Sequence, residues 1–388
     1  MEQREQILEK IQDLEEKNPT QFWSLVNKIK NKKQNQECID PDIFLDYFKT
    51  LHKPSTKNNF DNDFAKLINE KIKSNTSKVW SDTLDKHITQ KEITNASKLL
   101  KNKKACGFDK ISNEMIKHSL HIMMPLIHLF FNRILQTEFF PSAWSKGYII
   151  PLFKSGDESD PSNYRGITIS NCLSKLFTKI MTTRLLNFVD KHEIIKKNQI
   201  GFMPKNRTTD HLLVLKAIID SFKQCQKTLY ICFIDLKKAF DTVYQEGLIY
   251  KLQELNLSTK FINLIQSMYR NVTARIKTKK GFTTEFPVKI GTRQGCNLSP
   301  ILFNLYINDL PEQIKSKKSD SVIINNEEIN CLMYADGIVL LNKSESGIKL
   351  NLKYLENYGK KWRLNISVKK SKILIINRPK NTNFNFQI

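Results

Sequence analysis

The sequence lacks the cysteine pattern of a disulfide-bonded or zinc-binding protein. Its 388 residues include seven cysteines, scattered at positions 38, 106, 172, 225, 232, 296 and 331, with no Cys-x-x-Cys pair. No cysteine and histidine cluster has the spacing of a zinc site. This distribution argues against a structural metal and indicates a reducing compartment, so we expect an intracellular protein, in the nucleus or the cytoplasm.

Long apolar runs are absent as well. The start, MEQREQILEK, has no apolar core of the kind that a signal peptide needs. The most apolar window, residues 122–135, is short and carries His128 and Arg133, which predicts a buried helix and not a membrane span. We therefore expect no membrane partner, and we find no internal repeat.

Positive charge, in contrast, is in large excess. The 62 Lys and Arg residues outnumber the 39 Asp and Glu residues and give a net charge of +23. Such a charge points to a polyanionic partner. A bland alternative is a Lys-, Asn- and Ile-rich composition inherited from an AT-biased genome, and both explanations can hold together. At about 100–200 residues a domain, the length allows two or three domains.

The first 85 residues predict a basic helical extension. Residues 4–30 have helical periodicity, and Asp40-Pro41 has the form of a helix N-cap and first turn. The polar stretch 53–63 is a predicted linker. The helix after Asp40 is expected to carry one apolar stripe, made of Ile43, Phe44, Tyr47, Phe48 and Leu51.

Two cations flank a predicted hairpin further along the chain. Residues 101–117 predict a loop that enters a helix, and IIPLFKSGDESDPSNYRGITIS predicts a strand, a charged loop and a second strand. Lys154 and Arg165 stand at the edges of these strands. Two cations beside a loop are a solvated surface in most proteins, but the same pair would suit a triphosphate.

Two apolar segments each contain one isolated acid. TLYICFIDLKKAFDTV, residues 228–243, predicts a strand that ends on Asp235 and a helix that starts in LKKAFD. CLMYADGIVLL, residues 331–341, predicts a hairpin around Asp336 and Gly337. Between them, the loop GTRQGCNLSP opens the helix ILFNLYINDL.

Asp336 has two interpretations. An Asp-Gly pair between apolar residues is typical of a tight turn, in which Gly337 would supply the positive φ and the acid would have no chemical role. Alternatively, the hairpin presents a carboxylate for a purpose. If Asp235 and Asp336 are buried without an Arg partner, a shared divalent cation would offset the cost, and hard carboxylate ligands suit Mg²⁺.

The ordered motifs resemble those of the reverse transcriptases of non-LTR (LINE-type) retrotransposons. The resemblance rests on FIDLKKAFD, TRQGCNLSPILFNLYINDL, CLMYADGIVLL and WRLNISVKKSK. NYRGITISNCLSKLFTKIMTTRL and NQIGFMPKNRTTDHLLVLK resemble earlier motifs of that family. The blocks run in the family's order from about residue 100 to 376, which identifies the sequence as a relative.

The resemblance implies an α+β right-hand polymerase fold, with fingers and an antiparallel palm sheet flanked by helices. Residues 86–230 would form the fingers side of the domain and residues 231–388 the palm. We also expect the thumb to be largely missing, and we see no counterpart of the endonuclease domain of related elements. The chain would then be a fragment of a longer element or a reduced copy.

The resemblance also implies an RNA-directed DNA polymerase that uses an RNA template, a DNA primer and deoxynucleoside triphosphates. Asp235 and Asp336 would hold two Mg²⁺ ions, with Mn²⁺ as a substitute. Triphosphate contacts would come from Arg165 and Lys154, and one Lys of 369–372 would lie near the pyrophosphate. Phe240 would exclude a 2′-hydroxyl, and Gln294 and Gly295 would line the nucleotide pocket.

Gly337 departs from the family pattern, which has a second Asp at this position in a Tyr-x-Asp-Asp motif. Loss of one preorganised catalytic group typically lowers a rate by about 10² to 10³. We therefore expect reduced or absent polymerase activity. The alternatives are a catalytically inactive RNA- and DNA-binding protein with the same fold, or a polymerase that makes RNA, against which Phe240 argues.

Overall fold

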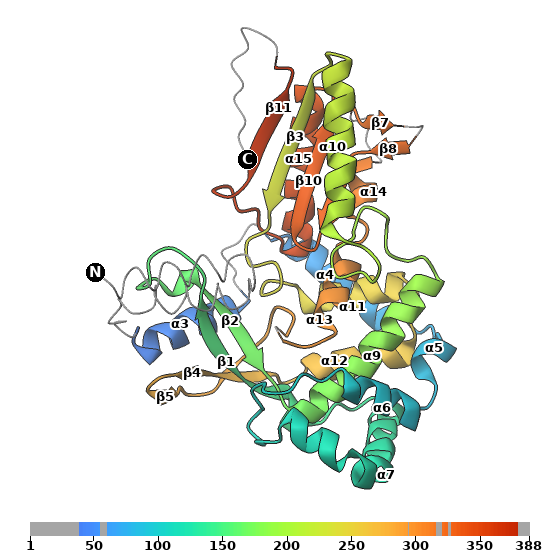
Figure 1. Cartoon of the computed structure of the whole chain (residues 1–388), viewed down its shortest axis with the longest axis vertical. Helices are drawn as coiled ribbons and strands as arrows, with labels where there is room; N and C mark the ends of the chain where they lie inside the picture. Colours follow the sequence, from blue (N-terminus) through green and yellow to red (C-terminus); the bar gives the residue numbers. More distant parts are fainter. Residues whose placement is uncertain (1–38, 55–59, 294, 316–319, 325–326, 379–388) are drawn as a thin grey trace, which may run out of the picture.

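The computed structural model describes residues 39–54, 60–293, 295–315, 320–324 and 327–378 (Figure 1). The predicted helix at 4–30 and the predicted site residue Gln294 lie outside these residues. The helices in the described part are α3 (Pro41–Leu51), α4 (Asn62–Ser74), α5 (Asp82–Asp85), α6 (Gln90–Lys98), α7 (Asn113–Thr137), α8 (Ser142–Ser145), η1 (Pro161–Asn163), α9 (Cys172–Lys191), α10 (Thr208–Gln224), α11 (Gln245–Glu254), α12 (Thr259–Tyr269), α13 (Ser299–Tyr306), α14 (Leu310–Lys315) and α15 (Glu345–Trp362).

The described strands form three sheets. They are β1 (Lys146–Phe153), β2 (Tyr164–Ile169), β3 (Leu229–Asp235), β4 (Thr273–Thr278), β5 (Gly281–Phe282), β6 (Phe286–Pro287), β7 (Val322–Ile324), β8 (Glu327–Ile329), β9 (Cys331–Tyr334), β10 (Gly337–Asn342) and β11 (Lys372–Ile376). One sheet has the order β2-β1-β4-β5, with β6 also paired to β4, and a second has the order β11-β3-β10-β9. β7 and β8 form a separate pair. The expected mixture of helices and sheets is confirmed.

The four-stranded sheet is antiparallel and lies between two helices, α10 and α15 (Figure 1). Along β3, Leu229 and Ile231 pack with Ile218 and Phe222 of α10. Cys232 and Ile234 point to the other face and belong to the core that contains α15. Because both faces are covered, β3 is a continuous apolar run, which explains why Ile234 breaks the simple alternation.

The five-stranded sheet joins two distant segments. β1 and β2 form the expected antiparallel hairpin, while β1 pairs in parallel with β4, more than 100 residues later. One face packs against α3, where Phe44 and Phe48 meet Ile149 and Ile276. α3 begins as predicted, because the Asp40 side chain accepts a hydrogen bond from Asp42 N at 3.1 Å.

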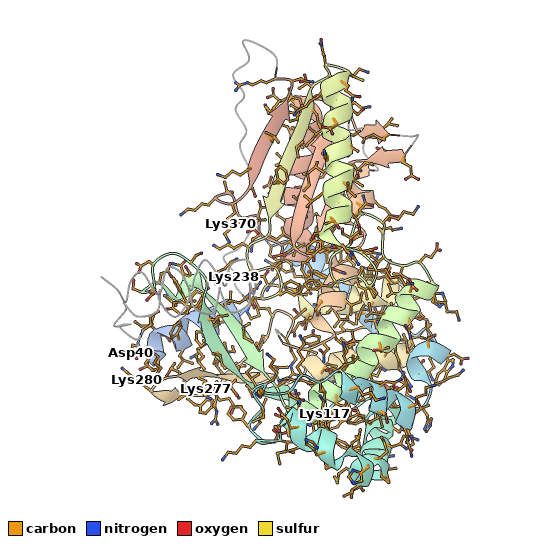
Figure 2. All side chains as sticks on the ribbon, viewed as in Figure 1. Asp40, Lys117, Lys238, Lys277, Lys280 and Lys370 are labelled. Carbon is orange, nitrogen blue, oxygen red and sulfur yellow. The ribbon has the colours of Figure 1, made fainter. Side chains whose placement is uncertain are left out.

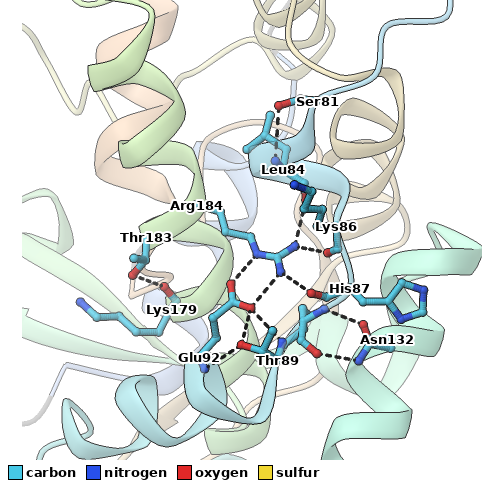
Figure 3. A network of polar contacts seen from close by, with 11 residues as sticks. Ser81, Leu84, Lys86, His87, Thr89, Glu92, Asn132, Lys179, Thr183 and Arg184 are labelled. Carbon is cyan, nitrogen blue, oxygen red and sulfur yellow. Dashed lines mark hydrogen bonds and ion pairs between the residues drawn. The ribbon is translucent and has the colours of Figure 1, made fainter.

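A buried arginine ties α9 to α6 and to the segment before it (Figure 3). Arg184 Nε and Nη2 lie 2.7 and 3.0 Å from the two carboxylate oxygens of Glu92. Its guanidinium also donates to the carbonyls of Leu84, Lys86 and His87. Burial alone would raise the pKa of Glu92, but the hydrogen bonds and charge of Arg184 hold the pKa below its ordinary value.

Two sequence expectations need correction. The window 122–135 is helical but is buried on one face only: Ile127, Phe131 and Leu135 of α7 lie in the core, whereas Ile122, Leu126 and Leu129 are exposed. The segment after Asp235 does not enter a helix at once. It makes a turn with Lys238 at φ 51°, and α11 starts only at Gln245, because a non-glycine residue in this conformation interrupts a right-handed helix. Among the described helices, none is long and apolar enough to cross a membrane.

Candidate active site

The two predicted acids lie together at one end of the four-stranded sheet. In the antiparallel register of β3 and β10, Asp235 is opposite Gly337, which directly follows Asp336. The end of β3 is tied to the segment before β11, because Ser367 N donates to Asp235 O at 2.8 Å. The register therefore brings the backbone of Asp235 and Asp336 to the same end of the sheet, as the sequence predicted.

The expectation that these carboxylates are buried is wrong. The Asp235 side chain is 42% exposed, and Asp336 is half-exposed. Asp235 also has a cationic neighbour, since Lys370 Nζ lies 3.6 Å from its Oδ2. Both acids lie at the end of the sheet and are partly open to solvent, so a burial penalty does not by itself require a cation.

The hairpin turn differs from the turn that the Asp-Gly pair predicts. β9 ends at Tyr334 and β10 starts at Gly337, so Ala335 and Asp336 are the two turn residues. Positive φ occurs at Ala335, at 54°, whereas Gly337 is an ordinary strand residue. A Cβ at Gly337 would have only the Tyr334 carbonyl oxygen near it, at 3.4 Å. The turn therefore does not require glycine at position 337.

A buried glutamine that the sequence did not single out holds this turn. Gln199 Oε1 accepts hydrogen bonds from Ala335 N and Gly201 N, both at 2.9 Å. Its Nε2 donates to Ala335 O at 3.2 Å. The surrounding segment also runs along the edge of β9, where Met333 N donates to Asn198 O and Ile200 N to Met333 O. Only its place within NQIGF could have pointed to Gln199.

The two predicted triphosphate ligands lie on the β1–β2 hairpin. Arg165 is exposed in β2 opposite Leu152. Lys154 follows the last residue of β1 and remains in the hairpin, with its N–H donating to Asn163 O at 3.0 Å. The hairpin therefore carries both cations on its distal half.

Gly295 connects the loop before α13 to this hairpin. Its φ is 101°, and a Cβ on it would lie 2.3 Å from the carbonyl oxygen of Thr168 in β2. Gly291, at φ 87°, makes a similar close approach to the carbonyl of Asp241 in the turn after β3. Only glycine fits such positions, so this loop contacts both the hairpin and the turn that follows Asp235.

Phe240 lies in the same turn and is half-buried. Its ring centroid is 4.6 Å from that of Phe303 in α13 and 6.2 Å from that of the exposed Phe202. Its carbonyl oxygen accepts a hydrogen bond from Thr292 N at 2.7 Å. A cavity beside these residues is lined by Gly166, Thr168, Asp241, Thr292 and Arg293, among others. β2, the turn and the loop before α13 therefore converge.

Lys238, the residue in left-handed conformation, points back toward α3. Its Nζ lies 4.3 Å from the centroid of the Tyr47 ring. Burial lowers the pKa of Lys238, the negative charge of Asp241 raises it, and the positive charge of Lys370 lowers it further. Lys370 belongs to the predicted 369–372 cluster, and it is the same lysine that forms the ion pair with Asp235.

The donor set fits a hard divalent cation held by few protein ligands. Asp235 and Asp336 supply carboxylate oxygens, which Mg²⁺ prefers, and both are accessible to water and substrate oxygens. In the part of the chain that the structure describes, no group of three or more His, Cys, Asp or Glu side chains could hold a metal ion.

Comparison with known proteins yields a family match and several relatives. Residues 154–386 match the family model described as reverse transcriptase (RNA-dependent DNA polymerase). The probable RNA-directed DNA polymerase from transposon BS of Drosophila melanogaster is 27% identical over 316 residues, which cover 76% of this chain and 34% of that protein. The RNA-directed DNA polymerase from mobile element jockey of the same species is 26% identical, over 73% of this chain and 31% of that protein.

A third relative comes from another type of mobile element. The retrovirus-related Pol polyprotein from type-1 retrotransposable element R2 of Popillia japonica is 29% identical, over 60% of this chain and 32% of that protein. The chain spans about a third of the length of these relatives. Apo telomerase from Candida tropicalis, truncated from its C-terminal domain, matches with a TM-score of 0.43 and 15% identity, over 67% of this chain and 57% of that chain.

Proposed function

Because the chain belongs to the reverse transcriptase family, we propose that it carries the RNA-directed DNA polymerase domain of a non-LTR retrotransposon. Its substrates would be an RNA template, a DNA primer and deoxynucleoside triphosphates. One observation carries the proposal: the register of β3 and β10 sets Asp235 beside the Asp336–Gly337 end of the hairpin. The four-stranded sheet would be the palm.

In this proposal Asp235 and Asp336 hold the catalytic Mg²⁺ ions. When bound, such ions activate the primer 3′-hydroxyl and stabilise the leaving pyrophosphate, and Mn²⁺ can substitute for them. The contribution of the chain is to keep both carboxylates at neighbouring strand ends. Gln199 supports this by holding the turn backbone on both sides of Ala335.

Gly337 stands where the family motif has its second Asp, and we propose that this impairs catalysis. Directly opposed residues of an antiparallel pair project from the same face of the sheet. A carboxylate at position 337 would therefore lie on the side of Asp235, with which Gly337 is paired. Without it, one ion loses a ligand, and a rate reduction of about 10² to 10³ follows if the effect equals that of one preorganised group.

The nucleotide would bind between the hairpin and the turn after β3. Arg165 and Lys154 would contact the triphosphate, and Lys370 would lie near the pyrophosphate, which its ion pair with Asp235 supports. Phe240 would lie under the sugar and exclude a 2′-hydroxyl. Gly295 would let the loop backbone approach the base pair. Gln294, its neighbour in the sequence, is proposed for the same pocket.

The proposed division of the chain keeps residues 86–230 as the fingers side and 231–388 as the palm, after an extension at 1–85. The sheet that contains β4 crosses this division, because β4 pairs with β1. We propose an intracellular protein, as its nucleic-acid substrates require.

A second candidate is a catalytically inactive RNA- and DNA-binding protein with the same fold. The observation that favours it is the pair of carboxylates, without a third acidic ligand among the described residues. The net charge of +23 would serve such a protein equally well. Both candidates are expected to bind RNA and DNA, but only the polymerase would extend a primer.

Primer extension on a homopolymer RNA template, with Mg²⁺ and separately with Mn²⁺, tests the proposal. We expect slow extension that requires a divalent ion and disappears in the Asp235→Ala variant. A binding measurement on the same RNA–DNA hybrid between about 50 and 200 mM salt should show steep salt dependence. Tight binding without any extension, even in the Gly337→Asp variant, would favour the inactive binding protein.

A further inference from the structure

The face of β4 that turns away from α3 is polar and open. Along the strand, Ala274 and Ile276 are buried with Phe48 of α3, while Arg275 and Lys277 alternate with them and are exposed. Arg275 is paired with Tyr148 of β1, and Lys277 with Phe282 of β5. Side chains of one sheet face thus bring two cations and two aromatic rings together.

A third ring comes from the loop before α7. The centroid of Phe108 lies 5.3 Å from that of Tyr148 and 5.5 Å from that of Phe282, and the last two are 5.4 Å apart. The Tyr148 hydroxyl donates to Cys106 O at 2.8 Å, which holds the loop against the sheet. Three distant segments therefore build one aromatic cluster.

The two cations lie over these rings. Arg275 Cζ is 5.7 Å from the Phe108 centroid, and Lys277 Nζ is 5.5 Å from the Tyr148 centroid and 5.9 Å from the Phe282 centroid. Arg275 also forms an ion pair with Glu285 at 3.3 Å. We call Phe108, Tyr148, Arg275, Lys277 and Phe282 the aromatic platform.

A purely structural role explains only part of the platform. Tyr148 is 6% exposed and forms the buried floor of the platform, but Phe108 and Phe282 remain 40% and 48% exposed. Rings whose only task was to join the loop to the hairpin would be expected to bury most of their surface. The exposed rings leave apolar surface available to a ligand.

The residues around the platform carry an excess of positive charge, which favours a negatively charged ligand. The loop at 101–110 contains Lys101, Lys103, Lys104 and Lys110, and the hairpin adds Lys279 and Lys280 to Arg275 and Lys277, against the acids Asp109 and Glu285. Figure 2 shows Lys277 and Lys280 at the β4–β5 hairpin, well away from Lys370 at the end of the four-stranded sheet. Exposed rings with an excess of cations are the features that bind unpaired bases and their phosphates.

We propose that the aromatic platform binds single-stranded RNA, and that this RNA is the template before it pairs with the primer. The second half of this statement rests on the proposed function. The sheet itself offers a path: Tyr148 is opposite Ile169, and on the same face Leu152 is opposite Arg165. A single-stranded RNA whose bases stack on Phe108 and Phe282 would thus continue over β1 and β2 toward the bound nucleotide.

Fluorescence anisotropy with a labelled short oligouridylate tests the platform without any need for catalysis. Phe282→Leu keeps an apolar side chain of similar size but removes the ring, and Phe108→Leu does the same in the loop. Each should raise the Kd about five- to a hundredfold, the range for one stacked base. Lys277→Gln should lower the slope of log Kd against log salt by about one.

Trp80 provides a matched control, because it is an exposed ring with the cation of Lys260 at 5.6 Å from its centroid, outside the platform. Trp80→Leu should leave the Kd unchanged. All variants should keep the melting temperature of the unmodified protein, since the altered rings are exposed. A blunt RNA–DNA hybrid should bind equally to the unmodified protein and the Phe282→Leu variant, whereas a hybrid with a 5′ template overhang should not.

The outcomes separate this inference from the proposed function. If Phe282→Leu and Phe108→Leu bind oligouridylate like the unmodified protein, the platform is refuted, even where primer extension succeeds. If they lose oligouridylate binding while the protein extends no primer, the platform stands and the polymerase proposal fails. Equal weakening by Trp80→Leu would also refute a site at the platform.

Discussion

Both ends of the Gln199 side-chain amide are hydrogen-bonded to the backbone of Ala335, the residue of positive φ beside Asp336. A left-handed alanine is strained, and such a conformation persists only when the surrounding structure holds it. The amide holds both the N–H and the carbonyl oxygen of this residue, which belong to the two peptide units that flank its Cα. Gln199 is therefore a positioning residue for the hairpin carboxylate.

Gln199→Glu tests this role, because it keeps an acceptor for Ala335 N but removes the donor to Ala335 O. We expect a loss of about 1–3 kcal/mol in the free energy of unfolding. Hydrogen exchange at the Ala335 amide should accelerate relative to the core of β3. In the Gly337→Asp background, kcat should fall about tenfold with little change in KM, since the template and nucleotide contacts are untouched.

The matched control for this change is Gln136→Glu, at an exposed position of α7. It should alter neither the exchange of Ala335 nor kcat. A Gln199→Glu variant whose kcat and KM are both unchanged would show that the hairpin keeps its geometry without the amide.

Gly337→Asp should raise primer extension by at least about a hundredfold, because it restores a carboxylate on the side of Asp235. The backbone accepts the side chain, since the added Cβ meets only the Tyr334 carbonyl, at 3.4 Å. Two opposed carboxylates repel each other by roughly 0.2–1 kcal/mol without a cation. The melting temperature of this variant should therefore drop slightly in EDTA and rise with Mg²⁺.

Asp235→Ala in the same background should abolish the gain and the Mg²⁺-dependent stabilisation together. Gly337→Asn is the size-matched control and should give neither. An inert Gly337→Asp protein that still binds Mg²⁺ and RNA would place the defect outside the hairpin.

Phe240→Val should admit ribonucleotides if the ring excludes a 2′-hydroxyl. We expect the ratio of kcat/KM for ribo- to deoxynucleotides to rise by about tenfold or more, measured by single-nucleotide incorporation in the Gly337→Asp background. Phe202→Val is the control, because this exposed ring is a neighbour of Phe240, with 6.2 Å between the ring centroids, and is not predicted to contact the sugar. Parallel loss of both activities would mean that Phe240 serves only its packing against Phe303.

His52 should make stability depend on pH. Burial lowers its pKa from 6.5 to about 4, although a hydrogen bond with the backbone of Ile290 acts in the opposite direction. Between pH 6.5 and 4 the unfolded chain binds a proton that the folded protein does not, so stability falls as the pH is lowered through this window. The full effect is about 3 kcal/mol.

Urea unfolding at a series of pH values measures this dependence. His52→Leu should flatten the curve between pH 4 and 6.5, whereas His118→Leu, at an exposed position of α7, should not. An unchanged slope in the His52 variant would show that other groups cause the loss.

The sequence by itself determined the features that adjacent residues encode. Asp40 caps α3, the hairpin of β1 and β2 carries Lys154 and Arg165, and the strand of β3 ends on Asp235. Capping, alternation and turn formation depend on neighbours in the chain, so a local pattern predicts them. The order of motifs predicted the family in the same way.

Only the tertiary structure decided which distant groups meet. The sequence predicts the positive φ of the hairpin at Gly337, but it occurs at Ala335, because Gln199 supplies hydrogen bonds that no local pattern contains. The tertiary structure left Asp235 partly exposed at the end of β3, beside Lys370, although apolar neighbours in sequence predict burial. Phe108, Tyr148 and Phe282 gather because β4 pairs in parallel with β1, and a pairing between strands over 100 residues apart depends on the packing of the whole sheet.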